Sequence, residues 1–158
     1  MDYLTLKWLH VLSSTVLFGT GIGSAFYLLV ATLSRDVRTI AAVTRWVVAA
    51  DWLFTATTAV LQPLTGLWLV RMAGMPLSVP WIEWSLWLYA LAIACWLPVV
   101  WIQVRLRVLA NAAAAQGSAT LPRAFWRFFA AWVGLGFAAF FAFLAIFYLM
   151  VAKQLPWT

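Results

Sequence analysis

Residues 49–70 read AADWLFTATTAVLQPLTGLWLV, an apolar run that carries a regular series of polar side chains. Successive polar positions are four, three, four and three residues apart, namely Asp51, Thr55, Thr58, Gln62 and Thr65. This spacing places all five on one face of a helix. Because hydrocarbon offers no hydrogen-bond partners, a polar stripe within a membrane has to face other helices. The stretch therefore predicts a membrane helix inside a bundle.

The composition of the whole chain places it in a lipid bilayer. Of its 158 residues, 66% are hydrophobic and 9% are charged. Soluble domains average about 45–50% apolar and about 25% charged residues, so this chain could not cover its surface in water. The formal net charge is +6, but the basic residues lie at the ends of apolar runs, where anionic head groups account for them. The lipid bilayer is the expected partner, and nucleic acid is not.

Four apolar segments are long enough to cross a membrane as helices. They are separated by SRDVR, AGMPLSVP and QGSATLP, which carry turn-forming residues. The sequence therefore predicts an all-α, integral membrane four-helix bundle that forms a single domain over residues 1–158. The expected spans cover about residues 4–33, 40–72, 81–110 and 122–152.

The distribution of basic residues predicts the orientation of the bundle. The first and third connections must lie on the same side of a four-span protein, and most of the ten basic residues flank them: Arg35, Arg38, Arg45, Arg105, Arg107, Arg123 and Arg127. The positive-inside rule assigns this side to the cytoplasm. We therefore expect a multi-pass protein of the bacterial inner membrane, with both termini on the outer, periplasmic side.

The first predicted helix carries the only histidine of the chain, His10. Lys7, His10 and Ser14 fall on one helical face near the outer end of the span. Glu83 and Lys153 belong to the same depth, so we expect an outer polar cluster of Lys7, His10, Glu83 and Lys153. The charges are explained either by interfacial salt bridges or by a site, since an imidazole at that depth needs a hydrogen-bond partner or a metal.

A single histidine limits the metal chemistry that one chain can perform. It excludes a bis-histidine haem and a three-histidine zinc or copper site within one chain. One axial ligand to a haem iron remains, which makes His10 the candidate iron ligand. Ser14, Gln62 and Trp87 are the other candidates for a cofactor-binding surface. Cys95 is the only cysteine, so neither an intrachain disulfide nor a CxxC motif is present.

The polar stripe contains one carboxylic acid, Asp51, which has two interpretations. As a structural residue it is either protonated or hydrogen-bonded to Tyr27 or Ser24, which belong to the same depth of the first helix. As a catalytic residue it is a proton relay, because ionisable groups within a membrane are costly and commonly functional.

Pro63 interrupts the backbone hydrogen bonding of the second predicted helix. Proline has no N–H, so the carbonyl one turn earlier, at Ala59, loses its helical donor. We therefore expect a freed carbonyl and a kink at this point.

Small and aromatic residues in the middle of the spans also have two interpretations each. Gly19 and Gly23 form a GxxxG pair, which favours close approach of another helix, although glycines also clear space for a planar cofactor. Trp52, Trp87 and Trp96 lie deeper than the aromatic belts at the membrane surfaces. They either pack within the bundle or form the wall of a flat aromatic ligand site.

The order of motifs resembles a family of four-helix bacterial inner-membrane proteins of unknown function. The resemblance covers nearly the whole chain. It rests on five stretches in order, YLTLKWLHVLSSTVLFGTGIGSAFYL, AADWLFT, QPLTGLWLV, WIEWSLWLYALAIACWLP and RFFAAWVGLGFAAFFAFLAIFYLMVAK.

More distantly, LKWLHVLSSTVLFGTG and PLTGLWLV resemble the first two helices of HemJ-type protoporphyrinogen oxidases and of CopD-like membrane domains. The HemJ type binds haem b through a first-helix histidine, so this resemblance implies that His10 is a haem-b ligand. The HemJ type also carries a lysine on its third helix, where this sequence offers Glu83. The further histidines and methionines of CopD-like domains are missing.

Three functional hypotheses follow. The first is a small redox-linked membrane protein, an oxidoreductase if it is an enzyme, that binds haem b through His10 and uses Asp51 as a proton relay. The alternative is a non-catalytic accessory or assembly subunit of a larger membrane complex, or a homo-oligomer. A third is a permeation path along the polar stripe.

The orientation gives the first testable prediction. At both termini, alkaline phosphatase fusions are expected to be active and green fluorescent protein fusions to be dark, because most basic residues flank the two connections at the opposite end. Fusions of alkaline phosphatase and of green fluorescent protein, compared at each terminus, measure this directly. Fluorescent termini without phosphatase activity would reverse the orientation.

Overall fold

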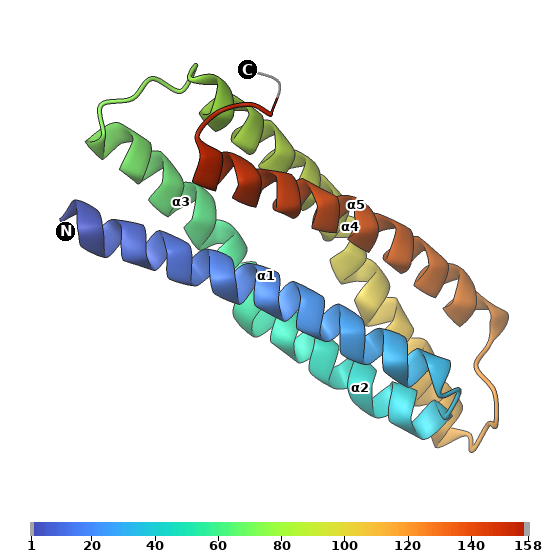
Figure 1. Cartoon of the computed structure of the whole chain (residues 1–158). Helices are drawn as coiled ribbons and strands as arrows, with labels where there is room; N and C mark the ends of the chain where they lie inside the picture. The colour runs from blue at the N-terminus through green and yellow to red at the C-terminus, as the bar shows by residue number, and fades with distance from the viewer. Residues whose placement is uncertain (1, 157–158) are drawn as a thin grey trace.

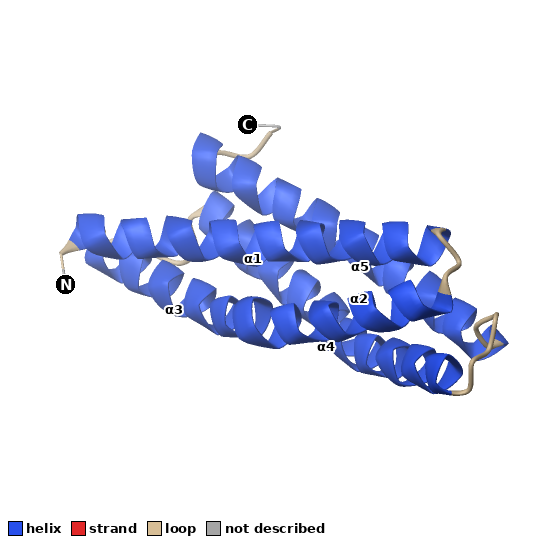
Figure 2. Cartoon of the chain, turned by 90° about the horizontal axis from the view of Figure 1, so that it is seen from below, coloured by secondary structure: helices blue, strands red, loops and turns tan. Residues whose placement is uncertain are grey.

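The computed structural model describes residues 2–156, in which all regular structure is helical (Figures 1 and 2). Four helices are long and apolar enough to cross a membrane, which confirms the predicted all-α membrane fold. The second of these is divided by a π-helical turn. The elements in order are α1 Tyr3–Leu33, α2 Val37–Ala50, η1 Asp51–Thr55, α3 Ala56–Met72, α4 Pro80–Ala115 and α5 Arg123–Ala152.

Capping residues set the helix boundaries that hydropathy alone places less accurately. The Asp36 carboxylate accepts a hydrogen bond from the backbone N–H of Thr39 at 3.0 Å, so α2 begins at Val37 and not at residue 40. The helix α4 continues beyond residue 110 through the alanine-rich stretch NAAAA, because alanine has the highest helix propensity. It ends before Gly117, whose positive φ of 64° suits glycine.

The two termini lie at the same end of the bundle as the connection from α3 to α4 (Figure 1). We call this the terminal end. The opposite, arginine-rich end carries the α1–α2 and α4–α5 connections. Towards it, α1, α2, α4 and α5 bury a common apolar core that includes Leu28, Ile40, Leu106 and Phe125.

The polar stripe faces the interior of the bundle, as its spacing predicts. Asp51, Thr55, Thr58, Gln62 and Thr65 are all buried. Several threonines satisfy their hydroxyls within their own helix; the Thr58 hydroxyl, for example, donates to the carbonyl of Phe54. The stripe therefore faces the bundle interior. Its polar atoms that no group of their own helix satisfies belong to Asp51, Thr55 and Gln62.

One turn of the second span is a π-helix, which the sequence did not indicate. The backbone N–H of Ala56 donates to the carbonyl of Asp51, five residues earlier. Such a turn holds one more residue than an α-helical turn and often marks a functional site. Here it begins at the only acidic residue of the polar stripe, Asp51.

The carbonyl that Pro63 deprives of its helical donor has found another one. The Tyr89 hydroxyl of α4 donates a hydrogen bond to the carbonyl of Ala59. This bond joins α3 to α4 at the point where the α3 ladder is interrupted. It satisfies a backbone group that would otherwise lack a partner within the membrane.

The Tyr89–Ala59 bond predicts that Tyr89→Phe destabilises the unmodified protein more than it destabilises the Pro63→Ala protein. Tyr89→Phe is expected to lower the free energy of unfolding by about 1–3 kcal/mol, because a buried carbonyl loses its donor. In a Pro63→Ala background the restored backbone N–H supplies that donor, so the same substitution is expected to cost little. Reversible unfolding in mixed micelles measures both differences.

Tyr27→Phe serves as the matched control, since Tyr27 is 66% exposed. An equal loss for Tyr89→Phe in both backgrounds would show that the hydroxyl does not serve the carbonyl freed by Pro63.

Candidate functional site

The imidazole of His10, on α1, faces α3 and contacts Thr65 of the polar stripe. Its Nδ1 atom is 2.8 Å from the Thr65 hydroxyl oxygen. The Thr65 hydroxyl donates to the carbonyl oxygen of Leu61, 2.8 Å away. A hydroxyl has only one proton, so it cannot donate to a second acceptor at the same time. With that proton donated to Leu61, the hydroxyl can only accept from the ring, so we expect the proton of His10 on Nδ1 and its lone pair on Nε2.

Gly66 makes room for the imidazole. A Cβ atom at this position would lie 3.1 Å from Cε1 of His10, closer than ordinary packing allows. The glycine therefore lets α3 approach the histidine ring while Thr65, the adjacent residue, binds it. QPLTGLWLV thus supplies both the hydrogen-bond acceptor and the space for the ring.

The three residues predicted to accompany His10 differ in their surroundings. The Ser14 hydroxyl donates to the carbonyl of Val11 at 2.7 Å, within its own helix. Gln62 is buried, and its Oε1 atom has no hydrogen-bond partner in the described part of the chain. Trp87 is 67% exposed on the outside of α4, so it does not line an interior site.

The charged members of the outer polar cluster also remain apart. Lys7, Glu83 and Lys153 are exposed, and residues 2–156 contain no salt bridge that links them. Lys153 instead ends α5 in a left-handed conformation, with a φ of 53°. Exposed lysines at helix ends can extend to the head groups, so the structure does not require these charges to bind each other.

Asp51 is paired with a tryptophan of α4. The indole Nε1 of Trp96 donates to Oδ1 of Asp51 at 3.2 Å, and Asp51 is only 5% exposed. The predicted partners on α1 were wrong. The Ser24 hydroxyl donates to the carbonyl of Gly21 at 3.1 Å, and Tyr27 faces outwards.

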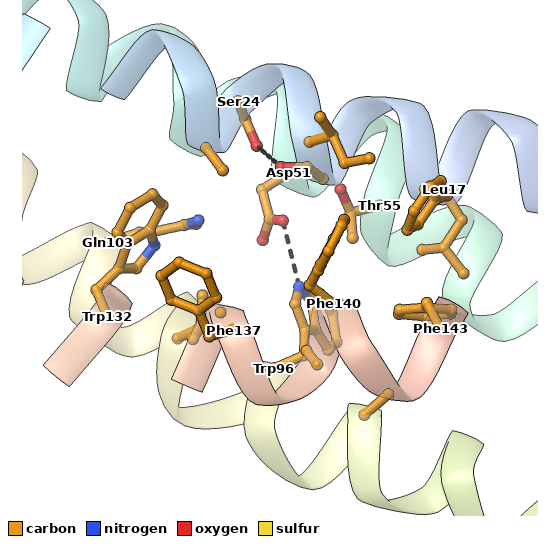
Figure 3. Close-up of a pocket in the computed structure, with 18 of the residues that line it drawn as sticks. Leu17, Ser24, Asp51, Thr55, Trp96, Gln103, Trp132, Phe137, Phe140 and Phe143 are labelled. Atoms are coloured by element: carbon orange, nitrogen blue, oxygen red, sulfur yellow. Dashed lines mark hydrogen bonds between the residues drawn. The ribbon is translucent and has the colours of Figure 1, made fainter. Parts of the chain in front are cut away.

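A cavity of about 430 Å³ lies beside Asp51, between α1, η1, α4 and α5 (Figure 3). Its walls are mainly apolar, with Asp51, Gln103 and Trp96 among the polar residues that line it. Ile22 of α1 and Phe137 of α5 also line it and are exposed on the outer surface, so the cavity opens sideways between these helices. His10 is not among the lining residues.

The glycines of α1 border open space within this chain. A Cβ atom added to Gly19, Gly21 or Gly23 would meet no described atom within 4 Å. The GxxxG pair therefore does not pack against a described helix of the same chain. Gly21 lines the cavity, as does Gly136 of α5, which is equally uncrowded.

The deep tryptophans divide in a way that the sequence could not indicate. Trp96 turns inwards to Asp51, whereas Trp52 and Trp87 are exposed on the lipid-facing surface. Trp132, which belongs to the inner aromatic residues of α5, is buried and lines the cavity. Sequence reasoning missed Gln103 and Trp132 because nothing local distinguishes them from other residues near a membrane surface.

Among the described residues, no group of three or more histidine, cysteine, aspartate or glutamate side chains could hold a metal ion.

Taken together, the helices, the buried polar stripe and the side-opening cavity define a four-helix integral membrane protein. The chain belongs to the DUF2269 family, described as a predicted integral membrane protein, whose model matches residues 4–154. No curated protein and no solved structure matches it.

The His10–Thr65 bond predicts the tautomer of the only imidazole. Protein labelled with ¹⁵N-histidine should give one ring spectrum with the proton on Nδ1, because the Thr65 hydroxyl accepts from that atom. Thr65→Val is expected to abolish this preference. A ring protonated on Nε2 in the unmodified protein would overturn the assignment.

Proposed function

We propose that this protein binds haem b through Nε2 of His10 and acts as a redox-linked membrane protein. The observation that carries the proposal is the Nδ1 contact with Thr65, 2.8 Å long, which leaves Nε2 with its lone pair. Histidines that bind metals almost always donate their second ring N–H to a neighbouring group in this way. The contact both orients the ring and selects the tautomer that ligates a metal.

The residues around His10 suit one axial ligand to a haem iron. The contact with Thr65 would prevent the ring from rotating. Gly66 would leave space for the ring, because a side chain at that position would collide with it. When bound, a haem supplies one-electron transfer, and its potential depends on the axial ligand and on the polarity of the surroundings. Gln62, whose Oε1 is buried without a partner among residues 2–156, is the nearest stripe residue on the inner side of Thr65.

The resemblance of the first two helices to HemJ-type proteins supports the same ligand. The HemJ type also carries a lysine on its third helix, which this chain lacks, so porphyrinogen oxidation is not part of the proposal. The distribution of arginines supports a location in the bacterial inner membrane with the terminal end outwards. Asp51 remains the candidate proton relay, and a homo-oligomer or a larger membrane complex remains the expected setting.

An absorption spectrum tests the proposal. Protein purified from membranes, or reconstituted with haem, is expected to show a Soret band and, after dithionite reduction, sharpened α and β bands. His10→Ala should lose these bands while keeping its helical content, because the chain has no second histidine to replace the ligand. Thr65→Val should keep haem but shift its reduction potential, since the ring N–H loses its acceptor.

Ser14→Ala is the control on the same helix, since the Ser14 hydroxyl bonds only to its own helix. A folded protein that stays colourless after reconstitution would contradict haem binding and favour the accessory-subunit hypothesis. Haem retained by His10→Ala would contradict the ligand.

A further inference from the structure

We propose that the cavity between α1, η1, α4 and α5 binds a lipid-soluble quinone that enters sideways from the bilayer. The proposal does not rest on haem binding, because His10 does not line this cavity. Its volume of about 430 Å³ falls within the range of about 300–1,000 Å³ that is usual for small-molecule sites.

Gln103 is the strongest sign that the cavity receives a polar group. It lies on α4, lines the cavity and is only 5% exposed. Its side chain makes no hydrogen bond to any residue in the range 2–156. Its amide therefore reaches the cavity without a partner. An amide surrounded by apolar walls is costly unless it is hydrogen-bonded, so this side chain favours a ligand that can bond to it.

Two neighbouring groups extend the polar patch. The Trp132 indole lines the cavity from α5, and its buried Nε1 has no acceptor in the described structure. Asp51 contributes a carboxyl group of which Trp96 occupies only Oδ1. Figure 3 shows Gln103 and Trp132 close together to the left of Asp51, with Trp96 below it. The patch thus offers N–H donors for carbonyl oxygens and an acceptor for a hydroxyl.

The rest of the cavity selects a flat, uncharged molecule. Phe137, Phe140 and Phe143 of α5 supply aromatic walls. Gly21 and Gly136, where an added Cβ atom would meet no described atom within 4 Å, keep space for a ring between α1 and α5. A quinone ring carries two carbonyl oxygens, stacks on aromatic side chains and has an apolar tail that suits the lateral opening.

Other membrane molecules satisfy this cavity less well. A phospholipid head group is charged and belongs at the membrane surface, whereas the cavity lies in the middle of the spans. A fatty-acid carboxylate would place a second acidic group beside Asp51. An alkyl chain alone would leave Gln103 without a partner. The donors, the acceptor and the aromatic walls together favour a quinone or its hydroquinone.

The test uses the whole protein in lipid nanodiscs, with decylubiquinone as the probe. Quinones quench tryptophan fluorescence, and Trp96 and Trp132 both line the cavity. We expect a saturable component of quenching as the mole fraction of probe in the lipid rises. The same titration on His10→Ala protein should give the same result, which separates this inference from the haem proposal.

Two matched pairs of variants locate the binding. Gly136→Leu and Gly21→Leu fill the cavity and are expected to weaken saturable quenching by about ten-fold or more, since the ligand's space is taken. Gly134→Leu and Gly19→Leu are their controls, because these glycines are equally uncrowded but do not line the cavity. Gln103→Leu is expected to weaken binding by about five-fold, through the loss of one hydrogen bond.

Competition with decylbenzene, which has the same tail and no carbonyl groups, tests the polar recognition. Because decylbenzene lacks the quinone ring, displacement of the probe would restore tryptophan fluorescence, and we expect little recovery even when decylbenzene is in excess. Full recovery at a mole fraction equal to that of the probe would show that the cavity recognises only an apolar chain, which overturns the quinone assignment. Quenching without a saturable component, or an equal loss in the Gly134→Leu and Gly136→Leu proteins, would overturn the site.

Discussion

Every polar group within the hydrocarbon must find its partner in the chain, because the surrounding lipid supplies none. This constraint accounts for the helices themselves and for the contacts between them. The Thr58 and Thr65 hydroxyls of the polar stripe bond to their own helix, the Tyr89 hydroxyl donates to the carbonyl freed by Pro63, and the Trp96 indole donates to Asp51. The Tyr89 and Trp96 bonds join the second span to α4, and the His10–Thr65 contact joins it to α1. The helices are therefore held in register by the few polar groups that cannot be satisfied locally.

The same constraint makes the remaining polar atoms informative. Oγ1 of Thr55, Nε1 of Trp132 and Oε1 of Gln62 are buried without partners in the described part of the chain, and in a membrane such groups are costly. Gln103 borders the cavity without a hydrogen bond to residues 2–156. They fall into two regions. Gln62 is close in sequence to Thr65, which binds His10, whereas Gln103 and Trp132 border the cavity near the π-helical turn. The two regions lie along one polar stripe, which runs from Asp51 to Thr65.

The polar stripe contributes residues to both proposed sites, which remain separate. Its end at Thr65 orients His10, and its beginning at Asp51 forms part of the cavity. Between them, Tyr89 fixes α4 to α3 at Ala59, which also borders the cavity. A polar, partly satisfied line through an apolar bundle is an arrangement that can place two redox groups at different depths of one membrane. Its π-helical turn marks the inner of the two regions.

The sequence by itself determined the four spanning helices, the inward face of Asp51–Thr65 and the carbonyl freed at Ala59, because hydropathy, helical periodicity and proline chemistry are local properties. It also singled out His10, whose partner Thr65 was already part of the stripe. Only the tertiary structure decided that Trp96 binds Asp51, that Trp87 faces lipid, and that Gly19 and Gly23 border open space. These outcomes depend on which face of each helix meets a neighbour. In a membrane, both the lipid and the protein interior are apolar. The sequence alone therefore does not show whether a tryptophan or a glycine faces lipid or another helix.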